Sequence, residues 1–504
     1  MAVKAPATSR YTEVERKFDV VESTVSPSFD GIAAVTRVEK SPTQVLDAVY
    51  FDTPGRDLAA KGVTLRRRAG GSDEGWHLKL PAGPDARTEV RAPLDTAEND
   101  GAGHVTRDVP DELVDVVRAI VRNRSLEPVA RITTAREVHL LYGADGAVLA
   151  EFCDDQVTAW SAGAGDEEPT EQRWREWELE LRSPDASSAD LLDRLGNRLL
   201  DAGAVPARHG SKLARVLGVT PDGSQDSAVD PVQRALAEQV DSLLVWDRAV
   251  RADTEDAVHQ MRVTTRKIRS LLQAAQDSFG LSDSEWILDE LRELAGVLGV
   301  ARDAEVLAER YQQALDQLPP ELVRGRVRER LVDEARRRYQ TGLHRTLLAL
   351  RSQRYFRLLD GLEAVASRPP AAPPEQAPVT IEAAHKRIRK AAKAAEQAEE
   401  AERNEALHRI RKKAKRLRYT AAAINATKVA EQAKAVQTLL GDHQDSVVSR
   451  QHLIRQADAA HAADEDTFTY GVLYQQEADL AQKCREQLQP ALQKLDKAVR
   501  DIHH

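Results

Sequence analysis

The sequence is poor in cysteine, with two among 504 residues, Cys153 and Cys484. They stand far apart, in no metal-ligand spacing and no disulfide framework, which fits a reducing compartment. No apolar run approaches the roughly 20 residues that span a bilayer. The N-terminal stretch MAVKAPATSR also lacks the apolar region of a signal peptide. These absences argue against a secreted disulfide scaffold and predict a cytoplasmic protein with no membrane partner.

Aromatic residues are scarce at 4%, whereas 30% of the residues are charged. The net charge is −9, so any binding of a polyanion must come from local clusters of Lys and Arg. The sequence also has no phosphate loop of the form G-x-x-x-x-G-K-[ST], which argues against P-loop chemistry.

The length predicts two or three domains. Over about residues 9–218, turn signals alternate with short β-rich runs, which favours an antiparallel β-barrel or a strongly curved sheet. Residues 219–231 are polar, contain two Pro residues and are predicted to be a linker. The pattern is then helical through 232–500, and a Pro-rich break divides this region into halves of about 232–367 and 379–500.

Eight β-rich runs are the candidate strands of the first domain, and two amphipathic runs are its candidate helices. The strands are expected at 11–20, 44–52, 62–69, 75–81, 86–93, 129–137, 147–153 and 173–182. The helices are expected at 110–122 and 188–203.

The first of these strands carries the pattern E-x-E-x-K. Side chains alternate along a strand, so Glu13, Glu15 and Lys17 share one face. Taken alone, these residues fit a solvated edge strand. They also suit a cavity that holds a divalent cation and a phosphate chain, because carboxylates bind hard cations that keep phosphate oxygens as ligands. The charge pattern of the remaining strands distinguishes between the two interpretations.

Other strands repeat this charged alternation. Arg66 and Arg68 share a face, and so do Glu178 and Glu180. Arg131 and Arg136 are five residues apart, so a regular strand places them on opposite faces and both face inward only with a bulge or a strand end between them. Carboxylate pairs near both ends of the domain, with basic strands between them, predict a barrel lined for a metal-bound polyphosphate.

Several motifs in this region resemble the CYTH domain, the triphosphate tunnel metalloenzyme superfamily. Besides E-x-E-x-K, they are YFDTP at 50–54, LRRR at 65–68, WHLKLP at 76–81, WELELR at 177–182 and the late HGSKLARVL, which contains Lys212. The resemblance implies an eight-stranded antiparallel tunnel that hydrolyses or rearranges triphosphates with a divalent cation, Mg2+ or Mn2+.

The resemblance also implies roles for individual residues. Glu13, Glu15 and Lys17 would be catalytic. The metal ligands would be Glu13, Glu15, Glu178, Glu180 and Glu151. The phosphate-binding residues would be Lys17, Arg66, Arg68, Lys79, Arg131, Arg136 and Lys212. Which of Glu151, Asp154 and Asp155 faces inward stays open at this point.

The helical region contains an ungapped internal repeat, HQMRVTTRKIRSLL from His259 and HRIRKKAKRLRYTA from His408. Each copy is followed by an L-G-x-x-x-D segment, beginning at Leu298 and at Leu440. Repetition at such a distance predicts a duplicated helical bundle. On a helix, the His and basic residues of each copy form one stripe roughly 15 Å long, which suits an extended row of phosphates. A solvated basic face is the plainer alternative.

This half is similar to the CHAD domain, a helical domain named for conserved histidines. The resemblance implies two pseudo-symmetric four-helix bundles and binding of inorganic polyphosphate in a basic groove. The corresponding residues of the two copies are His259 and His408, Arg262 and Arg411, Arg266 and Lys415, Lys267 and Arg416, and Arg269 and Arg418.

The sequence therefore predicts a metal-dependent triphosphatase, with inorganic triphosphate as the favoured substrate and inorganic polyphosphate as a ligand of the helices. A thiamine triphosphatase, an adenylate cyclase of the same superfamily and a non-catalytic polyphosphate-binding adaptor are the alternatives. Binding of nucleic acid is disfavoured by the acidic net charge and by the lack of stacking aromatics on the basic stripes.

Overall fold

The chain forms two compact units, Met1–Pro231 with Leu244–Thr254, and Val232–Leu243 with Glu255–His504. The computed structural model describes residues 9–71, 73–83, 85–94, 109–161, 170–182, 188–219, 231–274, 285–367, 380–423 and 426–503.

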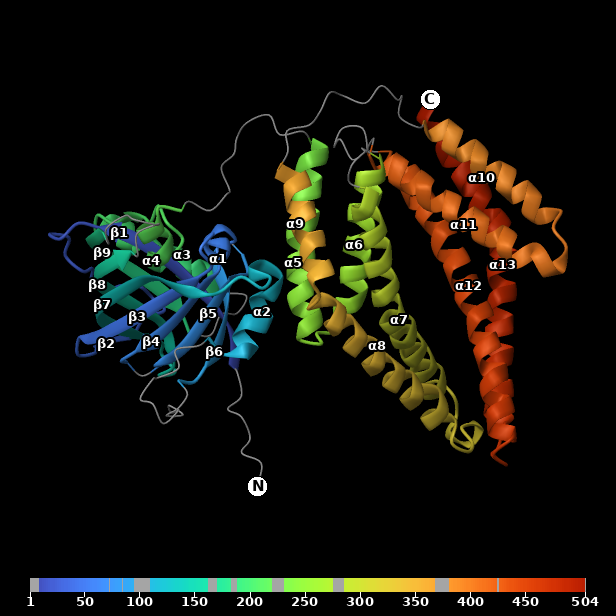
Figure 1. The fold of residues 1–504 in the computed structure, drawn as a ribbon, viewed down its shortest axis with the longest axis horizontal. Helices are drawn as coiled ribbons and strands as arrows, with labels where there is room; N and C mark the ends of the chain where they lie inside the picture. Colours follow the sequence, from blue (N-terminus) through green and yellow to red (C-terminus); the bar gives the residue numbers. More distant parts are fainter. Residues whose placement is uncertain are drawn as a thin grey trace. The chain divides into compact units, whose positions relative to one another are not determined.

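The first unit is built around a closed antiparallel barrel (Figure 1). Its eight strands follow the order β1-β6-β5-β4-β3-β7-β8-β9, and β9 pairs with β1 to close the ring. They are β1 (Ser9–Val20), β3 (Gln44–Asp52), β4 (Thr64–Ala69), β5 (Gly75–Pro81), β6 (Ala86–Ala92), β7 (Glu127–Tyr142), β8 (Val148–Ser161) and β9 (Thr170–Leu181). The short strands β2 (Arg37–Lys40) and β10 (Val205–Pro206) extend β7 and β1. The predicted eight-stranded barrel is confirmed.

The outer face of β1, β8 and β9 is covered by the helix α3 (Ser188–Asp201). Phe18, Phe152 and Trp177 alternate with the inward-facing charged residues of these strands and pack against Leu195 of the helix. Burying such side chains stabilises the fold by about 1.5–3 kcal/mol each. This apolar layer lets the same strands present charge to the interior.

One end of the barrel is filled by the helix α4 (Lys212–Leu217). Leu213 and Val216 of α4 pack against Ile132 and Val157, which belong to β7 and β8. Ser211 caps the helix by accepting a hydrogen bond from the Ala214 amide at 3.1 Å. Two further helices, α1 (Asp57–Ala60) and α2 (Asp111–Val121), also belong to this unit.

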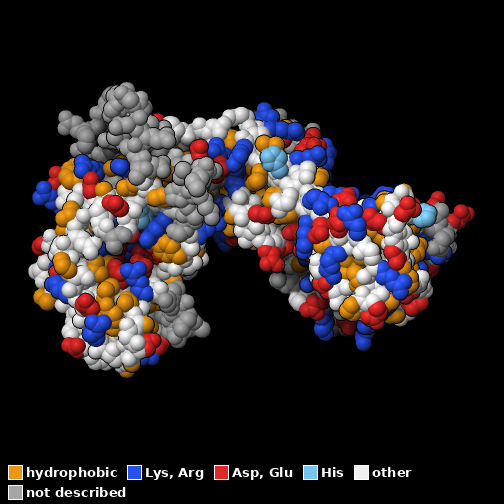
Figure 2. Space-filling model, turned by 90° about the horizontal axis from the view of Figure 1, so that it is seen from below, with side chains coloured by type: hydrophobic (Ala, Val, Ile, Leu, Met, Phe, Trp, Pro, Cys, Tyr) orange, Lys and Arg blue, Asp and Glu red, His pale blue; other side chains and the backbone are white. Residues whose placement is uncertain are grey.

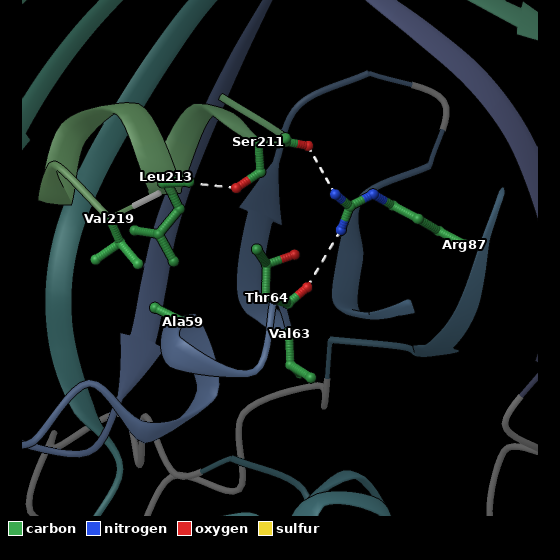
Figure 3. A pocket seen from close by; sticks show the side chains of 10 residues that line it. Ala59, Val63, Thr64, Arg87, Ser211, Leu213 and Val219 are labelled. Atoms are coloured by element: carbon green, nitrogen blue, oxygen red, sulfur yellow. Dashed lines mark hydrogen bonds between the residues drawn. The ribbon is translucent and has the colours of Figure 1, made fainter. Parts of the chain in front are cut away.

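Arg87 on β6 fixes the segment that leads into α4 (Figure 3). Its guanidinium donates hydrogen bonds to the carbonyl oxygen of Gly210 at 2.7 Å and to that of Gly62 at 3.3 Å. The Ser-Lys pair that follows is thereby held at the end of the barrel, with Lys212 buried.

The described part of the second region consists of helices joined by short turns and loops. It contains α5 (Pro231–Arg251), α6 (Ala257–Ala274), α7 (Glu285–Asp316), α8 (Glu334–Leu350), α9 (Gln353–Ser367), α10 (Ile381–Glu396), α11 (Glu400–Ala423), α12 (Thr427–His461) and α13 (Phe468–Arg500). Short turns of other helix types are Pro320–Leu322, Glu329–Asp333 and Asp501–His503. None of the described helices combines the length and the apolar character that crossing a bilayer requires.

The two halves of the helical region each have a core and meet through their long helices. In the second half, α10 to α13 bury an Ala-rich and Leu-rich core, whose small side chains allow close helix approach. The halves meet where Tyr311 of α7 stacks on His452 of α12, with 5.6 Å between the ring centroids. Arg310 of α7 also pairs with Glu477 of α13. The predicted all-α region is confirmed. Its second half is a four-helix bundle, α10 to α13, whereas the described first half has five helices, α5 to α9, where four were expected.

Candidate functional site

A charged cavity of about 730 Å3, open space at its mouth included, lies inside the barrel. Nine basic and six acidic side chains line it. The acids of the strands lie on β1, β8 and β9, whereas most of the basic residues lie on β4, β5, β6 and β7. Over the described surface in Figure 2, acidic and basic side chains are interspersed. The cavity thus has a carboxylate wall, a basic wall and a surplus of positive charge, as an anion bound with a cation requires.

The E-x-E-x-K residues all point into this cavity, as predicted. Glu13 pairs with Lys79 at 2.5 Å. The Lys17 ammonium lies 2.9 Å from Glu15 and 2.5 Å from Glu178. Although burial opposes ionisation, Lys17 and Lys79 lower the pKa of Glu15 to about 2. Glu15 is therefore a permanent carboxylate at neutral pH.

Glu180 is the exception on the carboxylate wall. The described residues offer it neither a hydrogen bond nor an ion pair, and burial together with the charge of Glu13 raises its pKa to about 7. A raised pKa of this kind marks a carboxyl group that is desolvated and lies near like charge. A divalent cation would supply the missing positive charge here, and oxygen ligands of this kind suit Mg2+ or Mn2+.

Another group of carboxylates is already neutralised. Asp155, Glu176 and Glu178 have oxygens within 4.8 Å of one another, a spacing that could hold a metal. The Lys212 ammonium, however, lies 2.7–2.8 Å from all three. Arg136 adds a second charge, bonding Asp155 at 2.6 and 2.8 Å and pairing with Glu178. The two cations therefore take the place that a metal would have in this group.

The basic wall contains buried arginines. Arg66 lies in the cavity, where its Nη1 bonds the Tyr50 hydroxyl at 3.2 Å and its Nε has no partner among the described residues. Arg68 is only 5% exposed, and burial together with Arg66 lowers its pKa to about 10. Desolvated guanidinium groups of this kind bind phosphate oxygens strongly.

One predicted phosphate-binding residue is wrong. Arg131 lies on the outer face of β7, mostly exposed, and pairs with Asp47 through two bonds of 2.8 and 2.9 Å. The register of β7 shifts opposite Tyr50 and Phe51, on the N-terminal side of Arg131. The strand is therefore regular between Arg131 and Arg136. An odd spacing on a regular strand places the two arginines on opposite faces, and only Arg136 lines the cavity.

The open question on β8 is also resolved. Glu151 lines the cavity, where it pairs with Arg182, and Asp155 is buried inside the barrel. Asp154 faces outward and bonds Arg175 at 2.6 and 2.8 Å. The strand is thus regular, with alternate residues facing in.

Sequence reasoning left several residues of the cavity without a role. For Glu176, Arg87 and Arg91, the charge and the alternation along a strand already indicate an inward-facing position. Asp73 lies in a loop and Tyr50 is uncharged, so neither signal applies to them. The unassigned residues that line the cavity or its closed end are Tyr50, Asp73, Arg87, Arg91, Asp155, Glu176 and Arg182.

In the helical unit, the repeated stripes face each other across its two halves. Burial and the nearby charges of Arg266, Arg411 and Arg418 lower the pKa of Lys415 to about 8. Arg266 of α6 is likewise affected by Arg411 of α11, so the cluster joins the two copies of the repeat. Within the described chain, no carboxylate pairs with the cluster's members, which are Arg262, Arg266, Arg269, Arg411, Lys415 and Arg418.

The L-G-x-x-x-D segments contribute the surface on which two of these arginines lie. A Cβ at Gly299 would lie 3.5 Å from Nε of Arg262, and a Cβ at Gly441 would lie 3.5 Å from Nε of Arg411. The Arg262 Nε also donates to the Ala295 carbonyl at 3.3 Å. The two parts of each repeat are therefore packed together, with glycine leaving room for the guanidinium.

The other predicted residues lie around this cluster. Burial and neighbouring basic side chains, Arg302 for His259 and Lys412 for His408, keep the pKa of both histidines below its ordinary value. Lys267 and Arg416 are exposed, one residue beyond Arg266 and Lys415 and thus about 100° further around each helix. Their role in binding stays a prediction.

A family model described as the CYTH domain matches residues 12–198, and one described as the CHAD domain matches residues 234–454. The chain belongs to the proteins that join these two domains. Two uncharacterized proteins of Mycobacterium tuberculosis, from strains CDC 1551 and H37Rv, are each 68% identical to it over 518 residues. Both alignments cover 99% of this chain and 99% of the relative.

Solved structures resemble parts of this CYTH–CHAD protein. The CHAD domain of Ricinus communis is 24% identical, with a TM-score of 0.38 and coverage of 53% of this chain and 93% of its own. PptA of Streptomyces chartreusis is 18% identical, with a TM-score of 0.38 and coverage of 52% and 98%. A Hippeastrum protein described as having a dominant triphosphatase activity is 14% identical, with a TM-score of 0.24 and coverage of 41% and 95%.

Proposed function

We propose that the CYTH barrel hydrolyses a triphosphate, with inorganic triphosphate as the preferred substrate, in the presence of Mg2+ or Mn2+. The observation that carries this proposal is the separation of charge across one cavity. Carboxylates face the interior from β1, β8 and β9, and unpaired or desolvated arginines face it from the opposite strands. A purely anion-binding cavity would gain nothing from the carboxylate wall.

The residues have distinct roles in this proposal. Glu13, Glu15 and Glu180 hold the cation, with Glu151 and Glu178 beside them on the same wall. A bound divalent cation would neutralise phosphoryl charge and supply an activated water. Arg66, Arg68 and Arg136 bind phosphate oxygens and stabilise the charge that develops on the transferring group. Lys17 orients Glu15 and Glu178 through its two ion pairs.

The test is phosphate release from inorganic triphosphate, ATP and thiamine triphosphate with Mg2+, Mn2+ or a chelator. We expect metal-dependent release, fastest from inorganic triphosphate, and its loss in Glu13→Ala with the fold retained by circular dichroism. Asp47→Ala is the matched control, because Asp47 is a carboxylate paired with an arginine on the outside of the same barrel. Full activity of Glu13→Ala would refute the assignment, and absence of turnover with tight triphosphate binding would favour the adaptor.

We further infer that the CHAD helices bind inorganic polyphosphate at the basic cluster shared by α6 and α11. Support comes from six basic side chains without carboxylate partners among the described residues, drawn from both copies of the repeat. Arg262→Ala combined with Arg411→Ala should weaken binding of long-chain polyphosphate and leave triphosphate turnover largely intact. Unchanged binding in the double variant would place the polyphosphate site elsewhere.

A further inference from the structure

Asp73 lies in the tight turn between β4 and β5, on the basic side of the barrel. Gly70 and Gly71 adopt φ values of +81° and +83°, which disfavour other residues. A Cβ at Gly70 would also lie 2.6 Å from the Val45 carbonyl oxygen. The turn is thus pressed against β3, and this fixes where Asp73 enters the cavity wall.

The backbone and the side chain of Asp73 have separate roles. The backbone carbonyl accepts hydrogen bonds from Nε2 of His77 at 2.9 Å and from Nη2 of Arg68 at 3.3 Å. The carboxylate pairs with Arg68 and lies 3.5 Å from Nη2 of Arg91. Since the hydrogen bonds to the carbonyl hold the turn, the carboxylate has no part in holding it and interacts with the two arginines.

The position of this carboxylate is unusual. Every other acidic residue that lines the described cavity belongs to β1, β8 or β9. Asp73 instead sits among the basic residues and is 32% exposed, whereas the Arg68 side chain beside it is only 6% exposed. A buried guanidinium needs a counter-charge, and a carboxylate bound by Arg has the geometry that a phosphate group would take. Asp73 can therefore move toward water, whereas Arg68 cannot.

We propose that Asp73 is a built-in competitor for the phosphate groups of the substrate, occupying Arg68 and Arg91 until a phosphate chain displaces it. The inference rests on the proposed function, and it names a residue that sets affinity for linear inorganic phosphate chains. In the free protein the carboxylate is the counter-charge of the buried Arg68 and lies beside Arg91, which is 33% exposed and also pairs with Glu89 at 2.6 Å. The entering anion takes over the same donors, and the net affinity is reduced by the Asp73 interaction it must replace.

The experiment is calorimetric titration of the full-length protein with inorganic triphosphate in the absence of metal, so that no hydrolysis intervenes. We expect Asp73→Asn to bind about three- to tenfold more tightly than the wild type, in line with the loss of one partly exposed ion pair. Asp73→Glu should restore the weaker affinity, because it restores the competing charge. Asp47→Asn, which loses an outer Asp–Arg pair of the same barrel, should bind as the wild type does.

The outcomes separate this inference from the proposed function. A wild type that binds no triphosphate here and releases no phosphate from it with Mg2+ or Mn2+ would refute the proposed function itself. If turnover needs the metal for binding as well, the KM of Asp73→Asn, expected below that of the wild type, replaces the titrated affinity. A wild type that binds triphosphate, together with an Asp73→Asn variant of equal or lower affinity, would overturn the competitor role, because a purely structural Asp73 predicts loss rather than gain. Melting curves of Asp73→Asn and Asp47→Asn establish that both variants are folded.

Discussion

Glu15 on β1 and Glu180 on β9 stand directly opposite each other in the register of the two strands that close the barrel. Glu151 on β8 faces Glu180 from the other side, so three carboxylates share one level of the cavity. Like charges directly opposed across a sheet are destabilising. Lys17 holds Glu15 ionised. Burial, the charge of Glu13 and, to a smaller extent, that of Glu15 raise the pKa of Glu180. Three carboxylates at one level of the barrel destabilise the fold unless a bound cation offsets their charge.

The first prediction is a pH-dependent stability of the metal-free protein. The pKa of Glu180 is about 7 in the folded barrel, above its ordinary value of 4.5. Because the folded state holds this proton more tightly, its stabilisation is present below about pH 4.5 and is lost as the pH rises through 7. We expect the wild type to lose more stability than Glu180→Gln between pH 5 and 8 in denaturant titrations. Equal losses in the two proteins would contradict the assignment.

Adding the cation should reverse this trend. Mn2+ at pH 8 should raise the unfolding midpoint of the wild type, because a ligand that binds the folded state stabilises it by mass action. The increase should be small in Glu180→Gln and at pH 5, where Glu180 is protonated and binds the metal poorly. A metal effect that is independent of pH would place the ion at another group.

The second prediction compares two arginines that the sequence treats alike. Arg66 lies in the cavity and bonds only Tyr50 among the described residues, whereas Arg131 lies outside and pairs with Asp47. Arg66→Ala should reduce triphosphate turnover at least tenfold, since it removes a charge-assisted contact with the phosphate. Arg131→Ala should change turnover little and the free energy of unfolding by less than about 1 kcal/mol. Steady-state kinetics and urea titration of both variants check this, and a turnover loss in Arg131→Ala would count against the observed register.

The barrel could be anticipated because a single rule, alternation along strands, fixes most inward-facing residues. The rule also warned that Arg131 and Arg136 could not both face inward without a bulge, and only the three-dimensional register showed that the strand between them is regular. The position of Asp73 could not be predicted from the sequence, for a different reason. It lies in a turn, where no periodicity applies, and its contact with Arg91 depends on how β6 lies beside β5.

In the helical half, too, the sequence predicts part of the site and the packing determines the rest. The repeat identified the basic residues and their spacing, but a single helix cannot reveal what its stripe faces. The approach of Lys415 to Arg266 arises from the packing of two halves far apart in sequence. The role of the glycines in L-G-x-x-x-D is likewise visible only in the structure, where Arg262 and Arg411 lie against them.

The third prediction concerns these glycines. A leucine at Gly299 or Gly441 would place atoms beyond Cβ where the guanidinium of Arg262 or Arg411 lies. Each substitution should weaken binding of long-chain polyphosphate roughly tenfold, the equivalent of one charge-assisted hydrogen bond. Gly296→Leu is the matched control, because a Cβ at that position of α7 meets nothing within 4 Å. It should leave binding unchanged and stabilise the helix by roughly 0.8 kcal/mol. Equal binding by Gly299→Leu and Gly296→Leu would mean that the glycine has no part in positioning Arg262.

The fourth prediction is a loss of polyphosphate binding on the alkaline side of neutrality. Burial and the surrounding arginines lower the pKa of Lys415 to about 8, so this ammonium is charged at pH 7 and largely neutral at pH 9. A polyanion binds the charged form better, and affinity should therefore fall as the pH rises through 8. His259 and His408 do not interfere, because their pKa values are lowered from 6.5 and both remain neutral over this range. Lys415→Arg should bind with little dependence on pH between 7 and 9, whereas Lys267→Arg, on the exposed neighbouring face, should keep the wild-type profile. Fluorescence titrations with long-chain polyphosphate at constant ionic strength make the comparison, and a Lys415→Arg profile as steep as that of the wild type would move the titrating group away from this cluster.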